Sequence, residues 1–391
     1  MAVRNGLDKL AGEFKDKFKG FRIGLVANSA SLSADGRTAW DLLLAAGFEL
    51  VCLFAPEHGT RLEHQEGIRF DSHHDDETGL PVRSLYDDQR KIDSSRFKDV
   101  DLILYDLPNV GCRFYTYVHT LVELLMYSHR SGLPIMVLDR PNPIRADIVE
   151  GPIARDDLRS PFGPDSVPVR FGMTLAEFAR SYVSRHRLST KLSFVLMDNY
   201  RRDMWFDETG LTFVPTSPNL RTLDAVTIYP GTCLIEGTTL SEGRGTEEPF
   251  EVFGAPWLDV SALRNRIAEY GFTSVAFEEC SFTPNRSKHA GEKCQGLRMK
   301  VIERDSLRPV SVMISIISQI RQLHPEQNLW IRDEREGRFF FDMLLCDDSL
   351  RTAIEEGENL NRYVLRYDEA ADRFAAKRSP FLAYKDEKSG G

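Results

Sequence analysis

Short apolar runs alternate with amphipathic helical patterns along the first half of the chain, and this alternation constrains the fold more than any other feature. Apolar runs typical of strands lie at residues 21–27, 48–54, 100–105, 134–138, 192–197 and 226–235. Apolar residues recur at helical spacing in 38–46 and 115–130, and Thr174 and Glu177 have the capping-box spacing that opens another helix through Tyr182. Strands that alternate with helices predict an α/β fold, in which a mostly parallel sheet carries helices on both faces.

The pattern changes after about residue 246. A helix is predicted near 260–270, strands at 274–277 and 297–302, and a strongly apolar helix through residues 313–323. A chain of 391 residues is longer than one hydrophobic core usually holds. We therefore expect two domains: residues 1–245 form the catalytic domain, and residues 246–391 form a smaller α+β domain that completes the cleft. The tail at 385–391 is expected to be disordered.

The charge and the apolar content exclude several classes of partner. The net charge of −9 argues against nucleic acid, because phosphate binding needs a basic surface. No apolar run reaches the ~18 residues of a membrane helix, and the N-terminus has no apolar stretch typical of a secretory signal. The six cysteines are scattered without a C-x-x-C pair, which favours reduced thiols. We expect a cytoplasmic protein without a membrane partner, and the pattern leaves its oligomeric state open.

Polar side chains follow the predicted strands at the points where these end. Since ligands of parallel sheets bind at the carboxyl ends of the strands, we expect one crevice there. Each group also has a structural interpretation, as a turn, a helix cap or an ion pair. The candidates are Asn28 after the first strand, Glu57 and His58 after the second, Asp106, Asn109, Arg113 and Tyr115 after the third, Asp139, Arg140 and Asn142 after the fourth, and Glu236, Glu242 and Arg244 after the run at 226–235.

Other chemistries lack their sequence patterns. No G-x-G-x-x-G follows the first strand, and the chain has neither a phosphate-binding G-x-x-x-x-G-K-[ST] nor a G-x-S-x-G motif. The histidines at 58, 64, 73 and 74 and the acids at 75 and 76 do not have metal-ligand spacing. We expect neither a cofactor nor a metal.

At these residues the chain resembles the exo-β-N-acetylmuramidase family, long known as a domain of unknown function. The matching segments include "FAPEHG", "VGCRFYTYVHT", "VLDRPNP", "SPNL", "YPGTCLIEGTTLSEGRGTEEPFEVFGAPW" and "RFAAKRSPFLAY". The resemblance implies a Rossmann-like domain joined to a smaller one. It also implies release of N-acetylmuramic acid from the non-reducing end of peptidoglycan fragments, such as a muropeptide-derived disaccharide.

The chain departs from the family pattern at three positions. Proline replaces glutamine at 108, an amide replaces an acid at 109, and phenylalanine replaces histidine at 171. Two alternatives therefore stay open: a catalytically inactive protein that binds sugars or peptidoglycan fragments, and a glycosidase for another N-acetylated sugar.

Cleavage of a glycosidic bond needs an acid for the leaving oxygen and a group that stabilises or traps the sugar cation. We expect Glu57 to be the general acid, because an apolar setting at a strand end can raise the pKa of a carboxyl group as a general acid requires. His58 would orient it or bind sugar. Glu236 and Glu242 are candidates for the second carboxylate, and Asp106 for orienting an acetamido nucleophile. The predicted substrate-binding set is Arg113, Arg140 and Arg244 for the lactyl carboxylate, Tyr115 and Tyr117 for the sugar face, and Asn28, Asn109, Asp139, Asn142 and Asn219.

Overall fold

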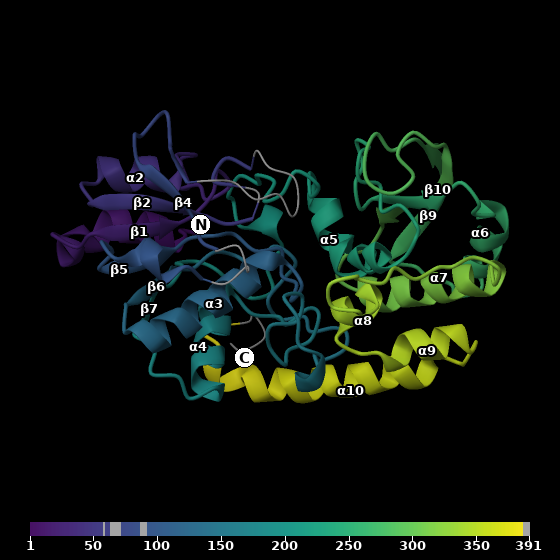
Figure 1. Ribbon diagram of the computed structural model, residues 1–391. Helices are drawn as coiled ribbons and strands as arrows, with labels where there is room; N and C mark the ends of the chain where they lie inside the picture. The colour runs from purple at the N-terminus through teal and green to yellow at the C-terminus, as the bar shows by residue number, and fades with distance from the viewer. Residues whose placement is uncertain (58, 63–71, 87–91, 386–391) are drawn as a thin grey trace.

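The computed structural model describes residues 1–57, 59–62, 72–86 and 92–385. The molecule has two halves that lie next to each other, each built on its own sheet (Figure 1). The larger sheet has seven strands in the order β3-β4-β2-β1-β5-β6-β7, and every pairing except β3 with β4 is parallel. Its strands are β1 Ile23–Val26, β2 Leu50–Ala55, β3 His73–His74, β4 Pro81–Ser84, β5 Leu102–Tyr105, β6 Ile135–Leu138 and β7 Leu192–Val195. The predicted parallel α/β sheet is therefore confirmed.

Helices cover both faces of this sheet. One face packs α3 (Thr116–Ser131) and α4 (Leu175–Arg185) into the larger core, and the other packs α1 (Gly6–Lys9) and α2 (Ala39–Ala45) into a separate one. The central strands β1, β5 and β6 are buried on both faces, which is why they read as continuous apolar runs. The predicted capping box of α4 is confirmed, since Thr174 and Glu177 bond to each other's backbone N–H groups.

The smaller sheet is antiparallel, in the order β8-β10-β9. Its strands are β8 Val252–Ala255, β9 Val275–Phe282 and β10 Cys294–Val301, and the helices of this half are α6 Val260–Ala268, α7 Pro309–Leu323, α8 Phe340–Leu345 and α9 Ser349–Glu355. The smaller α+β unit that the sequence predicts is thus present, built on its own antiparallel sheet.

One predicted strand is wrong. Residues 226–235 lie mostly in α5 (Leu223–Thr232), which continues into the 3₁₀ helix η6 (Cys233–Gly237). Every residue from Ala225 to Ile235 is buried, so the segment shows neither helical nor strand periodicity. The sequence did carry a local sign of the helix start, because threonine is a common N-cap residue. The Thr222 side chain accepts a hydrogen bond from the backbone N–H of Ala225.

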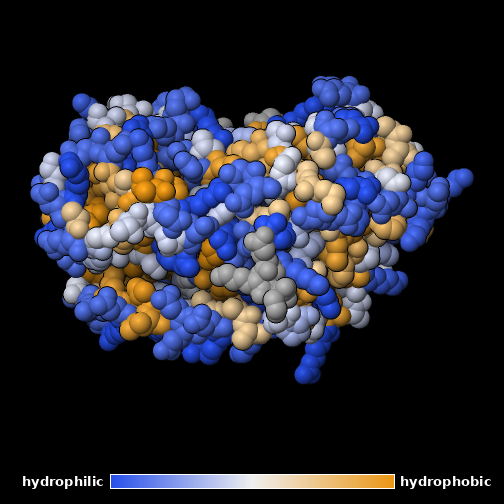
Figure 2. Space-filling model, turned by 180° about the vertical axis from the view of Figure 1, so that it is seen from behind, coloured by the Kyte–Doolittle hydropathy of each residue, from blue (hydrophilic) through white to orange (hydrophobic). Residues whose placement is uncertain are grey.

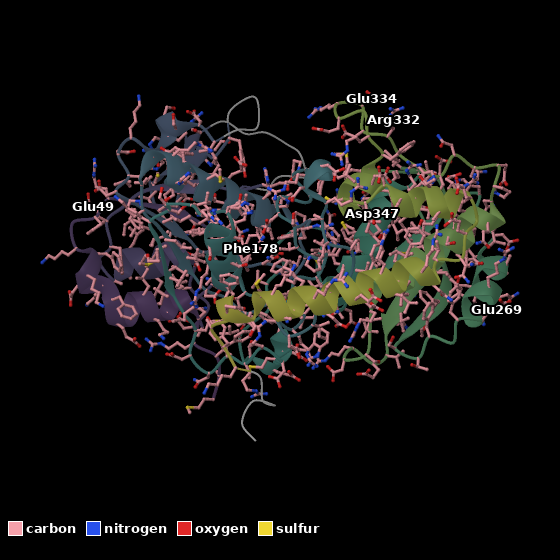
Figure 3. All side chains as sticks on the ribbon, turned by 90° about the horizontal axis from the view of Figure 1, so that it is seen from below. Glu49, Phe178, Glu269, Arg332, Glu334 and Asp347 are labelled. Atoms are coloured by element: carbon pink, nitrogen blue, oxygen red, sulfur yellow. The ribbon has the colours of Figure 1, made fainter. Side chains whose placement is uncertain are left out.

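The end of the chain returns to the first half. Helix α10 (Asn361–Arg378) runs beneath both halves, as the view from below shows, and leads to the 3₁₀ turn η7 (Ser379–Phe381) (Figure 3). At its start, Tyr367 donates a hydrogen bond to Asp347 in the second half, and at its end Arg378 donates to the carbonyls of Ala146 and Asp147 in the first. The remaining short helical segments are η1 Leu10–Phe14, η2 Lys15–Phe18, η3 Ser94–Phe97, η4 Asp156–Leu158 and η5 Phe206–Glu208.

The face of the molecule seen in Figure 2 is mainly hydrophilic, and apolar residues reach it in separate patches. In the part of the chain that the structure describes, no helix is both long and apolar enough to cross a bilayer. All six cysteines are free thiols, and only Cys280 is not fully buried.

Candidate active site

Glu57 lies two residues beyond the end of β2, half-buried at the carboxyl edge of the sheet. Its backbone carbonyl is 3.5 Å from the hydroxyl of Tyr117. Burial raises the pKa of Tyr117, and the nearby carboxylate of Glu57 adds to the shift. Glu57 therefore lies close to the start of α3. His58, which was predicted to assist it, lies outside the described residues.

Two tyrosines at the start of α3 lie next to Glu57: Tyr115, which is the N-cap residue, and Tyr117 in the first turn. They are called the tyrosine floor below. Asn28 donates to the Tyr117 hydroxyl (2.8 Å), which lies 3.1 Å from the carbonyl of Thr216. Tyr115 donates to the same residue, with 2.8 Å to its Oγ1. Both rings are buried, 5% and 0% exposed, so they cannot offer a face to a sugar as predicted. Asn28 is fully buried in the same network and takes no ligand there either.

Asp106 and Arg140 form a bidentate ion pair with both N···O distances at 2.7 Å. Asp106 is fully buried, and Arg140 also donates to the carbonyl of Leu32. This pair joins the loops after β1, β5 and β6. The fork of Arg140 already holds a carboxylate, and Asp106 is out of reach of a sugar acetamido group, which corrects both predicted roles.

Three other predicted ligand residues are structural. The guanidinium of Arg113 is fully buried and donates to the carbonyls of Pro152, Val167, Leu344 and Leu345. Asp139 accepts from Thr174, Tyr384 and the first turn of α4, and burial raises its pKa to about 7. Asn142 bonds to backbone on both sides of its amide. Arg113 and Asp139 are corrections, because burial behind the edge of the sheet separates them from a ligand. Asn142 borders a small second pocket with Asn109 and Arg140.

A second cluster of charges lies where α5 ends, not at a strand end. Arg244 lies 3.0 Å from a carboxylate oxygen of both Glu236 and Glu242, and Lys288 lies 2.8 Å from Glu242. The Glu242 side chain is 1% exposed and that of Glu236 is 18% exposed. Of the two carboxylates, Glu236 is the one that a ligand can reach.

The two carboxylates have opposite pKa shifts. Burial raises the pKa of Glu236, and Arg244 opposes this without cancelling it. Burial would also raise the pKa of Glu242, but Lys288 and Arg244 outweigh it and hold the pKa below the usual range. The charges of Lys288 and Arg244 thus favour the ionised form of Glu242, whereas burial favours proton uptake by Glu236.

A row of aromatic rings connects the cluster to the floor under Glu57. Tyr229 of α5 packs edge-on against Tyr115, with ring centroids 6.3 Å apart, and against Phe250 at 4.9 Å. The guanidinium of Arg244 lies over the Phe250 ring at 4.8 Å. The structure therefore brings Glu57, Glu236, Glu242 and Arg244 to the two ends of one aromatic row.

The hairpin between β9 and β10 supplies residues that sequence reasoning missed. Lys288 donates to the carbonyls of Ile235 and Thr238, and Arg286 donates to the side chain of Asn219 at 2.9 Å. Gly245 has φ of +82°, and a Cβ there would lie 2.7 Å from the backbone nitrogen of Arg286. The absence of a side chain at Gly245 therefore leaves room for the backbone of this hairpin. The only sign of these residues in the sequence was the basic run at 286–289, next to a turn.

His119 in the first turns of α3 was also missed. Burial lowers its pKa, and the nearby carboxylates of Glu123 and Glu57 oppose the shift. In the described part of the chain, no group of three or more His, Cys, Asp or Glu side chains is placed to hold a metal ion. In the histidine-rich segment considered above as a possible metal site, His73 and His74 are exposed and Asp75 accepts hydrogen bonds from Arg61.

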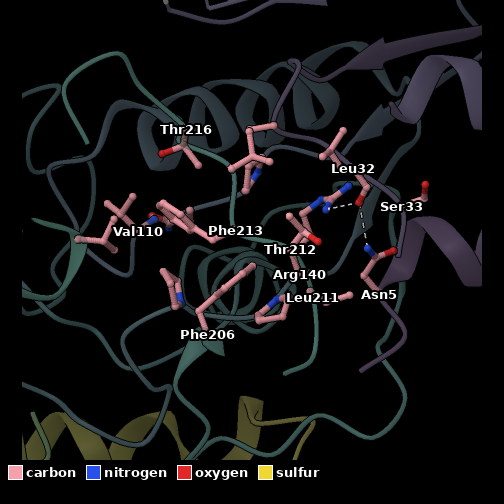
Figure 4. A pocket seen from close by; sticks show the side chains of 17 residues that line it. Asn5, Leu32, Ser33, Val110, Arg140, Phe206, Leu211, Thr212, Phe213 and Thr216 are labelled. Atoms are coloured by element: carbon pink, nitrogen blue, oxygen red, sulfur yellow. Dashed lines mark hydrogen bonds between the residues drawn. The ribbon is translucent and has the colours of Figure 1, made fainter. Parts of the chain in front are cut away.

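A pocket lies beside the tyrosine floor, at the point between β1 and β5 where the strand order reverses (Figure 4). The loops after β1, β5 and β6 and the segment 206–216 line it, and Asn109 is the predicted site residue that it exposes along with Arg140. Its interior has a volume of about 50 Å³, or about 580 Å³ with the open mouth included. Thr216 belongs both to this pocket and to the floor under Glu57.

Comparisons with known proteins match both halves of the chain. Residues 23–224 match the N-terminal domain of exo-β-N-acetylmuramidase NamZ, and residues 227–384 match its C-terminal domain. The peptidoglycan β-N-acetylmuramidase NamZ of Bacillus subtilis (strain 168) is 37% identical over 383 residues, which are 98% of this chain and 91% of that protein.

Two crystal structures of DUF1343 family proteins from Bacteroides fragilis NCTC 9343 have the same fold. One superposes with a TM-score of 0.89 at 25% identity and covers 98% of this chain and 99% of its own. The other has a TM-score of 0.74 at 27% identity and covers 99% and 100%. Both the family match and the Bacillus subtilis relative are β-N-acetylmuramidases, and the carboxylates at the two ends of the aromatic row agree with that chemistry. The protein is therefore a glycoside hydrolase. Within that class, the chain belongs to the exo-β-N-acetylmuramidase NamZ family.

Proposed function

We propose that the protein is an exo-acting hydrolase that releases N-acetylmuramic acid from the non-reducing end of peptidoglycan fragments, with a muropeptide-derived disaccharide as its simplest substrate. The observation that carries this proposal is the pair of acidic sites, Glu57 after β2 and Glu236 after α5, at the two ends of one aromatic row. The Bacillus subtilis relative, similar over nearly the whole chain, supports the choice of substrate.

Glu57 is the general acid of the proposed reaction. Its proton goes to the glycosidic oxygen as the bond between that oxygen and the anomeric carbon breaks, and the bonding electrons leave with the oxygen. The half-buried position at the edge of the sheet leaves its carboxyl group accessible while the tyrosine floor holds its backbone.

Glu236 is the proposed second carboxyl group. It is more exposed than Glu242, and its raised pKa suits a base that takes a proton from the attacking water. Glu242, which also pairs with Lys288, keeps Arg244 in place beside it. The acetamido oxygen of the substrate itself is the other candidate nucleophile, and the stereochemistry of the product distinguishes the two.

Arg244 is the residue proposed to bind the lactyl carboxylate of the substrate. Of the three arginines considered, Arg113 holds four carbonyls and Arg140 is bidentate on Asp106. Arg244 lies over the ring of Phe250, and 12% of its side chain is exposed, so its guanidinium can meet a substrate carboxylate at that edge.

The test is incubation with the disaccharide of N-acetylmuramic acid and N-acetylglucosamine, read by mass spectrometry. We expect both monosaccharides from the wild type, a loss of at least about a hundredfold in Glu57→Gln, and near wild-type turnover in the control Glu123→Gln, which changes a half-buried glutamate on α3. Binding of the disaccharide without cleavage by the wild type would instead identify a binding protein. Equal cleavage of the N-acetylglucosamine analogue would contradict the substrate.

A further inference from the structure

The pocket between β1 and β5 is electrically neutral although an arginine lines it. Arg140 is the only charged residue among those that line the described pocket. Asp106 matches it through two hydrogen bonds, and the carbonyl of Leu32 takes another. Because this charge is already compensated, the pocket offers a carboxylate or phosphate no strong partner. We therefore expect a ligand of this pocket to be uncharged.

The walls combine aromatic rings with polar groups that are free to bond. Phe206 and Phe213 meet edge-on with ring centroids 5.7 Å apart, both half-buried, and both border the pocket in Figure 4. Among the described residues, the Asn109 amide nitrogen and the Thr212 hydroxyl have no hydrogen-bond partner, while the Asn109 oxygen accepts from Val110 and Gly111. Apolar rings beside amide and hydroxyl donors suit the apolar face and the hydroxyl groups of a sugar.

The dimensions restrict how a sugar can lie. An interior of about 50 Å³ holds a few water molecules or one small substituent, and a whole hexose ring has to lie in the open mouth. An acetamido group has a methyl for the apolar interior and a carbonyl oxygen for the Asn109 amide nitrogen. We infer that this pocket is a second sugar-binding site, which takes a neutral N-acetylhexosamine with its acetamido group inward; the choice of an N-acetylated sugar rests on the proposed function.

The site is adjacent to the catalytic centre but separate from it. Glu57 does not line the pocket, and Thr216 is the shared wall, with its backbone carbonyl facing the tyrosine floor. A neutral sugar that is left after removal of the muramic acid residue fits this pocket, whereas the carboxylate of the muramic acid lies with Arg244. The two sites thus sort the two sugars of the disaccharide by charge.

The experiment measures binding of N-acetylglucosamine to the full chain by isothermal titration and by saturation-transfer NMR. We expect one saturable site and strongest saturation at the acetamido methyl. Phe213→Ala weakens binding by roughly tenfold, and Thr212→Val, at an exposed position, weakens it by about threefold. The matched control is Phe162→Ala, since Phe162 is also half-buried and edge-on to another ring, Phe340, but lies outside the pocket; it leaves binding unchanged.

Three results would overturn the inference. The first is no saturable binding to the wild type. The second is binding that Glu57→Gln abolishes and Phe213→Ala leaves intact, which would place the sugar at the catalytic centre. The third is equally tight binding of N-acetylmuramic acid with the same dependence on Phe213, which would contradict the argument from charge. Hydrolysis of the disaccharide by the wild type is a separate measurement, so a failure of the proposed function is distinguishable from each of these.

Discussion

At the scale of single residues, burial separates arginines that look equivalent in the sequence. Arg113 and Arg244 both follow glycine-containing segments rich in polar residues, yet Arg113 is 0% exposed and bonded to four carbonyls, and Arg244 lies between two carboxylates with 12% of its side chain exposed. Their substitution by methionine, which keeps the length but removes the charge, should therefore affect different properties.

Arg244→Met should lower kcat/KM for the muramic acid glycoside by about ten- to a hundredfold, because a charge-assisted hydrogen bond is lost. It should narrow the preference over the glucosamine analogue, as steady-state kinetics on both substrates would show. Arg113→Met should instead lower the free energy of unfolding by about 3 kcal/mol or more, since buried carbonyls lose their donors, and leave the preference of the folded fraction unchanged. An unaltered preference in Arg244→Met would contradict lactyl recognition by this residue.

Asp139 predicts a pH dependence of stability. Its pKa is about 7 in the folded protein, against 3.8 in an unfolded chain, so the folded state binds its proton more tightly. Its contribution is fully present below about pH 4 and is lost as the pH rises to 7, because the unfolded state gives up the proton first. In urea unfolding at several pH values, the stability of the wild type relative to Asp139→Asn should fall by roughly 4 kcal/mol between pH 4 and pH 8.

Asp165 is the control with the opposite sign. Burial would raise its pKa, but His186 and Arg185 outweigh this and hold it below the usual value. Its contribution is present at neutral pH and is lost as the pH falls toward the folded pKa, so Asp165→Asn should cost most at pH 7.

Parallel stability curves for the wild type and Asp139→Asn would contradict the prediction for Asp139, because they would show that this carboxyl group stays ionised in the folded protein.

At the scale of elements, the hairpin between β9 and β10 closes the charge cluster around Glu242. Lys288 is its anchor, with bonds to two carbonyls at the end of α5 and to the buried Glu242. Lys288→Met should destabilise the protein by about 3 kcal/mol, because it leaves Glu242 with Arg244 alone. Lys300→Met, which breaks an exposed pair between Lys300 on β10 and Glu278 on β9, should cost less than about 1 kcal/mol.

Urea unfolding and hydrogen exchange check this prediction. Exchange in residues 283–293 should accelerate in Lys288→Met and not in Lys300→Met. If both variants behave alike, the hairpin is held by its backbone contacts, such as that of Asn285 with Gly245, rather than by the lysine.

At the scale of the whole molecule, the C-terminal segment joins the two halves. Beyond α10, the backbone of Ala383 donates to Glu177, and the Tyr384 hydroxyl bonds to Asp139 while it accepts from the backbone of Met197. All three partners belong to the first half, far from the second sheet. The last helix therefore couples the stability of the two halves.

Deletion of residues 379–391 should lower Tm by about 5 to 10 °C, because these hydrogen bonds are lost. Differential scanning calorimetry should then resolve two transitions instead of one. Deletion of residues 386–391 alone should leave the single transition in place. One unchanged transition after the longer deletion would show that the hydrogen bonds from the backbone of Val310 and Ser311 to Glu150 and the bonds of Arg113 suffice to couple the halves.

The sequence by itself determined those features whose physical cause is local. Strands buried on both faces read as apolar runs, the capping box of α4 needs only two residues three apart, and Glu57 had to follow β2 because "PEHG" ends that run. Only the tertiary structure decided that residues 223–232 form a helix, since burial from all sides removes the periodicity that separates helix from strand. It alone decided which arginine a ligand can reach and that Lys288 meets Glu242, because both depend on chain segments that are distant in sequence, and loop closure over such distances leaves no mark in a local pattern.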